Sequence, residues 1–152
     1  MSSTAEREIV ITRVFNAPRE LVFKTWTDPR QIDQWWGPHG FTTVTASMDV
    51  RVGGAWVYLM RHAQYGEFPN RIVYREIVPP ERLVYTHDSG IDGDPSAFEV
   101  TVTFDALGQS TRLTMHSVLA SAAELERVKG FGAVEGGKQT LERFGQVLAG
   151  QV

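Results

Sequence analysis

The sequence of 152 residues predicts an α+β domain in which a seven-stranded antiparallel sheet wraps around a long C-terminal helix, with two small helices between the first two strands. Segments of alternating apolar and polar residues follow one another across short turns, which favours an antiparallel meander over parallel βαβ units. A single sheet also needs a cover for its apolar face, and the C-terminal helix is the only predicted element long enough to provide it.

The N-terminal elements are predicted from their start and stop signals. Glu8 to Phe15 (EIVITRVF) is rich in β-branched residues, which is typical of a strand. Pro18 suits the first position of a helix, and this helix is expected to end at Asp28. Asp28 can then cap a second, short helix, which Gly37-Pro38 ends.

Six further strands are predicted, separated by glycine, proline and polar residues. They span Phe41 to Val52, Ala55 to His62, Arg71 to Val78, Arg82 to His87, Phe98 to Phe104 and Thr111 to Ser117. From Ser121 the chain returns to helix, with Ser121 and Glu124 spaced as a capping box. Gly130 and Gly132 are expected to break this helix near Phe131. The apolar stripe that follows consists of Val134, Leu141, Phe144 and Leu148.

Composition limits the classes of function. A net charge of −3 lacks the basic excess of a nucleic-acid binder, and the absence of cysteine excludes disulfides, thiol catalysis and zinc–thiolate sites. The sequence shows neither a secretory leader nor an apolar run of membrane-spanning length, so no membrane association and a cytoplasmic location are expected. We expect residues 1–7 to form a flexible tail and residues 8–150 to form one domain.

Alternation along the strands predicts an inward face that mixes aromatic rings, methionines and a few polar atoms. Its members are Trp56, Tyr58, Met60, Ile72, Tyr74, Glu76, Leu83, Tyr85, His87, Val100, Val102, Phe104, Leu113 and Met115. Such a mixture suits a cavity for an apolar ligand. The same residues could instead fill a dry core, and both interpretations stay open at this stage.

Four stretches carry a family resemblance: VFNAPRELVFKTWTDPRQIDQWWGPHGF, GGAWVYLMR, FPNRIVYREIVPPERLVYTH and GGKQTLERFGQVLA. Together, from Ile9 to Ala149, they resemble proteins homologous to the C-terminal domain of the activator of the Hsp90 ATPase, within the START-like (SRPBCC) superfamily. The resemblance implies the helix-grip fold, with Trp35 or Trp36 lining or plugging a cavity unless both rings only pin the second helix. The pocket-facing positions that it implies are Trp36, Phe41, Trp56, Tyr58, Met60, Tyr74, Glu76, Tyr85, His87, Phe131 and Glu135.

Three functions follow as hypotheses. The first is binding of a small hydrophobic or aromatic molecule without a cofactor. No metal site is expected, since the four histidines occur singly. The second is a cyclase- or hydrolase-like enzyme that uses Glu76 or His87 in acid–base catalysis, although Glu76 can instead pair with Arg71, Arg75 or Arg82. The third, implied by the resemblance, is an interaction module that contacts a chaperone. Open sheet edges add a homodimer as a further expectation.

Overall fold

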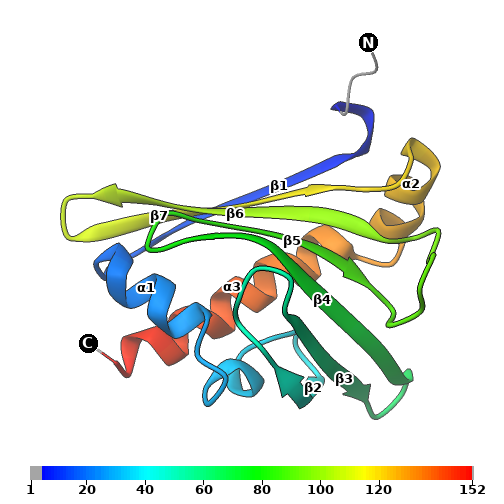
Figure 1. Cartoon of the computed structure of the whole chain (residues 1–152), viewed down its shortest axis with the longest axis horizontal. Helices are drawn as coiled ribbons and strands as arrows, with labels where there is room; N and C mark the ends of the chain where they lie inside the picture. The colour runs from blue at the N-terminus through cyan, green and yellow to red at the C-terminus, as the bar shows by residue number, and fades with distance from the viewer. Residues whose placement is uncertain (1–4, 152) are drawn as a thin grey trace.

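The computed structural model of the chain describes residues 5–151 and contains one seven-stranded antiparallel sheet (Figure 1). The strands are β1 (Glu8–Phe15), β2 (Phe41–Met48), β3 (Ala55–His62), β4 (Gly66–Val78), β5 (Arg82–Asp88), β6 (Phe98–Leu107) and β7 (Ser110–Val118). Their order across the sheet is β1-β7-β6-β5-β4-β3-β2, so β1 and β2 form opposite edges. The chain therefore crosses from one edge to the other between β1 and β2, and it does so through α1 (Arg19–Trp26) and the 3-10 turn η2 (Ile32–Gln34).

The long helix α3 (Ala133–Ala149) covers one face of the sheet, as Figure 1 shows. Its apolar stripe buries Leu141, Phe144 and Leu148 against the sheet. Gly137 permits a close approach to β1, because a Cβ atom there would lie 2.4 Å from Cδ1 of Ile11. The predicted α+β helix-grip fold is thus confirmed.

The predicted break at Phe131 is also confirmed, since α2 (Ala122–Gly130) ends there and Gly132 adopts a left-handed conformation with φ of 80° before α3 begins. Ser121 caps α2 by accepting a hydrogen bond of 3.0 Å from the Glu124 backbone nitrogen. Such a cap satisfies one of the free N–H groups of the first turn.

Several boundaries differ from the predictions for local reasons. The second helix is a single 3-10 turn, although Asp28 does accept a hydrogen bond of 2.9 Å from the Arg30 backbone nitrogen before it. Strand β2 ends at Met48 rather than Val52, and β4 begins at Gly66 rather than Arg71. Pairing of Gly66 with His62 extends the β3–β4 hairpin through residues that the sequence indicated as a turn.

The described part of the predicted tail is Ala5–Arg7, which forms a 3-10 turn. Arg7 holds this turn in place, because its guanidinium donates to the Leu119 carbonyl at 2.8 Å and its own carbonyl accepts from the Leu119 nitrogen. Residues 1–4 lie outside the described part of the chain. Within that part, none of the helices is both long enough and apolar enough to span a membrane.

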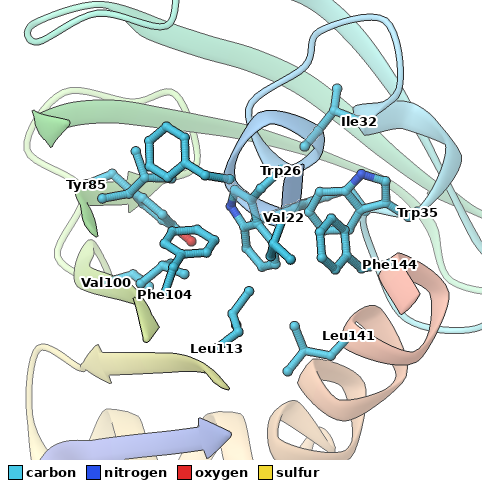
Figure 2. Packing of buried hydrophobic residues seen from close by; sticks show 14 of the residues in the cluster. Val22, Trp26, Ile32, Trp35, Tyr85, Val100, Phe104, Leu113, Leu141 and Phe144 are labelled. Carbon is cyan, nitrogen blue, oxygen red and sulfur yellow. The ribbon is translucent and has the colours of Figure 1, made fainter. Parts of the chain in front are cut away.

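The core centres on an aromatic cluster between the sheet, α1, η2 and α3 (Figure 2). The Phe144 ring lies 5.2 Å from Phe15, 5.0 Å from Trp26 and 4.7 Å from Trp35, measured between centroids. Trp35 is fully buried, so this tryptophan is a core residue that pins η2 against α3. The ring of its neighbour Trp36 packs edge-on against it, with centroids 5.4 Å apart, and also contacts Trp56 of β3.

Candidate functional site

A cavity of about 350 Å³ lies between the sheet and the first half of α3. Its walls come from the loop after η2, from β3, β5, β6 and β7, and from the α2–α3 junction. Within the described chain, this lining includes no Asp, Glu, Lys or Arg. Hollows of about 420 and 440 Å³ lie elsewhere, the first between β1 and the second half of α3 and the second beside β5, β6 and the end of β7. Charged side chains line both of them, such as Arg13, Glu142, Arg7 and Glu99.

The structure brings only part of the predicted set to this cavity. The predicted residues that line it are Trp36, Phe41, Met60, Tyr85, His87 and Phe131. Phe131 lies at the α2–α3 junction and is 80 % exposed, so it contributes to the rim rather than to the interior. Additional apolar walls come from Phe98, Val100 and Met115.

Trp56, Tyr58 and Tyr74 form a layer behind the cavity rather than its wall. The rings of Trp56 and Tyr58 stack at 4.1 Å, and Trp36 packs edge-on against Trp56 at 4.8 Å. Tyr74 is buried next to Tyr85, with ring centroids 6.5 Å apart. Glu135 is exposed on α3 and does not line the cavity, contrary to the prediction.

The prediction that Glu76 faces the cavity is wrong, because β4 contains a bulge. The register between β4 and β5 shifts between Tyr74 and Glu76, so Ile77 lies opposite the buried Leu83 and Glu76 turns to the outer face. There the carboxylate accepts a hydrogen bond of 2.9 Å from Nε of Arg82, at a site where 43 % of its side chain is exposed. The alternative of an arginine pair is confirmed, and a desolvated base at this position is excluded.

A chain of hydrogen bonds connects the cavity wall to the layer behind it. Trp36 Nε1 donates to the Tyr58 hydroxyl at 3.0 Å, and that oxygen lies 3.1 Å from Nε2 of His87. The same His87 nitrogen lies 2.8 Å from the Asn70 side-chain oxygen. Burial lowers the pKa of His87 to about 4 and raises the pKa of Tyr58, so both groups are neutral near pH 7.

Helix α3 also fixes the loop that forms one side of the cavity mouth. Arg143 Nη1 donates to the Gly37 carbonyl at 2.8 Å and lies 3.3 Å from the carbonyl oxygens of Pro38 and Phe41. Gln139 accepts a hydrogen bond of 3.0 Å from the His39 backbone nitrogen. These contacts tie the glycine- and proline-rich loop that follows Trp36 to α3.

Sequence reasoning missed some of these residues. Phe98 and Ser117 each continue the inward alternation by one step, next to Val100 and Met115, so extending that pattern would have found them. Arg143 carried no such signal, because an arginine beside an apolar helix stripe usually faces water. Among residues 5–151, no three His, Asp or Glu side chains lie close enough together to hold a metal ion.

Comparisons with known proteins agree with this architecture. The sequence profile of the family described as "Activator of Hsp90 ATPase homolog 1-like protein" matches residues 16–149. A crystal structure of a protein from Chromobacterium violaceum is 27 % identical, with a TM-score of 0.80 over 93 % of this chain and 96 % of that one. A solution structure from Arthrobacter aurescens is 23 % identical, with a TM-score of 0.87 over 98 % of this chain and 90 % of that one.

A third structure, described as the AHSA1 protein from Silicibacter pomeroyi, is 21 % identical, with a TM-score of 0.76 over 95 % of this chain and 99 % of that one. A comparison with curated proteins finds no match. The two structures below 25 % identity show a shared fold only. The profile covers most of the chain in a single stretch. The chain therefore belongs to the family of Activator of Hsp90 ATPase homolog 1-like proteins.

Proposed function

We propose that the protein binds a small apolar or aromatic molecule in the cavity between the sheet and α3. The observation that carries this proposal is the 350 Å³ space itself, which has no charged side chain in its described lining. Small-molecule pockets typically measure about 300–1,000 Å³ and are mainly apolar with a few polar groups. Protein cores, in contrast, rarely leave voids larger than a water molecule.

The lining chemistry supports an aromatic or similarly flat occupant. Trp36, Phe41 and Phe98 present ring surfaces, and rings favour edge-on or offset contacts with other rings. Met60 and Met115 add flexible thioether side chains, which adapt to the shape of an apolar molecule. Trp36 is held by its bond to Tyr58, so this part of the wall is already formed in the free protein.

The proposal can be tested by closing the cavity mouth. Ala133 lines the cavity at the start of α3, whereas Glu135 lies two residues later on the exposed side of the helix. With the neutral fluorescent probe N-phenyl-1-naphthylamine, we expect saturable binding to the wild type and to Glu135→Trp, but a loss of binding in Ala133→Trp. Equal binding by both variants would contradict the proposal.

The two other functions have weaker support. Acid–base catalysis now depends on His87 alone, because Glu76 lies on the outer face. The family description names activation of the Hsp90 ATPase, which would require a protein partner instead of a small molecule. A wild-type protein that binds no neutral probe, and that carries no copurified molecule in native mass spectrometry, would favour the protein-partner function.

A further inference from the structure

The hydroxyl of Tyr85 has no hydrogen-bonding partner among the described residues. Tyr85 is 2 % exposed and lines the cavity from β5. Figure 2 shows its side chain directed from the strand toward the buried cluster. A buried tyrosine hydroxyl usually finds a partner, because leaving it without one costs free energy. This hydroxyl is therefore a polar group that the protein itself leaves unused.

The Tyr85 oxygen is not sealed inside the core. In the described chain, Trp35 Nε1 is the only fully buried side-chain nitrogen or oxygen without a partner. The Tyr85 oxygen also lacks a hydrogen-bond partner, but it is not among these fully buried atoms. It therefore keeps some accessible surface. We take this accessible surface to face the cavity, because Tyr85 is one of the residues that line it.

The other polar groups in the lining are engaged or less buried. Trp36 donates to Tyr58, and the Thr140 hydroxyl donates to the Gly136 carbonyl at 3.0 Å. His87 lies within hydrogen-bonding distance of Tyr58 and Asn70. Ser117 is only half-buried. Tyr85 thus offers the most deeply buried free donor to a molecule in the cavity.

The charge of the surroundings narrows the class of ligand. No cation lines the cavity in the described chain, so a bound carboxylate would be desolvated without a partner, at a large cost in free energy. Burial also raises the pKa of Tyr85, which keeps the hydroxyl protonated and able to donate. An uncharged ligand with an acceptor oxygen is complementary to this arrangement.

We infer that the cavity, occupied as proposed above, selects uncharged aromatic molecules that carry a carbonyl-type acceptor, and that the acceptor oxygen takes a hydrogen bond from the Tyr85 hydroxyl. Tyr85 is then the residue that determines specificity, while the apolar wall supplies most of the affinity. The inference rests on the proposed function, but it makes a separate claim about the polarity of the ligand.

Equilibrium dialysis with three matched probes tests this claim. The probes are 2-acetylnaphthalene, its isostere 2-isopropenylnaphthalene, in which a methylene group replaces the carbonyl oxygen, and the anion 2-naphthoate. For the wild type we expect the ketone to bind about five- to tenfold more tightly than the olefin, which lies within the range of about two- to thirteenfold for one neutral hydrogen bond. The naphthoate should bind more weakly than either.

Two variants assign the preference to one oxygen atom. Tyr85→Phe should bind the olefin as the wild type does but should lose the preference for the ketone. Tyr74→Phe is the matched control, because it removes a hydroxyl from the adjacent buried ring, which does not line the cavity. It should keep the preference, and the olefin affinity reports whether each variant retains its cavity.

The outcomes separate the two claims. If the olefin binds but the ketone has no advantage in the wild type, the inference is overturned and the proposed function stands. The same holds if Tyr85→Phe keeps the preference, or if the naphthoate binds most tightly. If none of the probes binds to the wild type, the proposed function fails, and the inference fails with it.

Discussion

Replacing Arg143 by methionine should loosen the loop that precedes β2 and destabilise the whole domain. The guanidinium donates to the Gly37 carbonyl at 2.8 Å and lies 3.3–3.5 Å from the carbonyl oxygens of Trp36, Pro38 and Phe41. A hydrogen bond from a charged donor contributes about 1.5–3 kcal/mol, and the longer contacts add less. Methionine keeps part of the apolar stem, so we expect the free energy of unfolding to fall by about 2–3 kcal/mol.

Urea denaturation followed by tryptophan fluorescence measures this loss, and the melting temperature should fall by about 4–10 °C for a chain of this size. Arg112→Met is the control, since the Arg112 side chain lies on an exposed strand position and makes no hydrogen bond or ion pair with any described residue. Arg143→Lys should lie between the wild type and Arg143→Met, because an ammonium group cannot reproduce the planar fork of the guanidinium. A loss below about 0.5 kcal/mol in Arg143→Met, or one equal to that of Arg112→Met, would refute the role assigned to this residue.

Three further predictions concern buried polar groups. Hydrogen bonds, first from Gln31 and then from Arg30, lower the pKa of Asp28 from 3.8 to about 2. The ionised carboxylate therefore stabilises the fold by about 2 kcal/mol above about pH 4, and this stabilisation is lost as the pH falls toward 2. Urea titrations should show that Asp28→Asn is less stable than the wild type at pH 7 but equally stable at pH 2. Burial lowers the pKa of His87 from 6.5 to about 4, so the unfolded chain takes up a proton at this residue before the folded protein does. The free energy of unfolding should therefore fall by about 1–3 kcal/mol as the pH is lowered from 6.5 to 4. In His87→Gln that slope should flatten, and an unchanged slope would disprove its origin. Tyr58→Phe leaves Trp36 Nε1 without its acceptor and should cost about 1–3 kcal/mol in urea denaturation, where a neutral result would contradict the hydrogen-bond chain.

Most of the fold could be predicted because its signals are local and repeated. Alternation along β5, β6 and β7 placed Tyr85, Val100 and Met115 on the inward face, where the structure has them. The helix break near Phe131 followed from the flanking glycines, which combine low helix propensity with conformational freedom. Such features depend on neighbours in the sequence.

The site was harder to predict because it depends on neighbours in space. The bulge in β4 has no marked sequence signal, yet it exchanges Ile77 for Glu76 on the inward face and so removes the candidate catalytic carboxylate. Whether an inward aromatic ring lines a cavity or lies behind it depends on how other rings pack, as Trp56 and Trp36 illustrate. The alternation of inward and outward residues cannot distinguish rings that line the cavity from rings that lie behind it, since both occupy inward positions on their strands.

The position of β1 beside β7 has a consequence for the order in which the molecule is assembled. During synthesis, strands β2 to β7 can pair one after another as they leave the ribosome, whereas β1 must wait for β7, the last strand to be made. Pairings between segments so far apart in sequence slow folding, since a long loop must close first. The cavity also requires α3, which is made after every strand. A molecule bound in the cavity as proposed would therefore stabilise the protein only once this helix has docked.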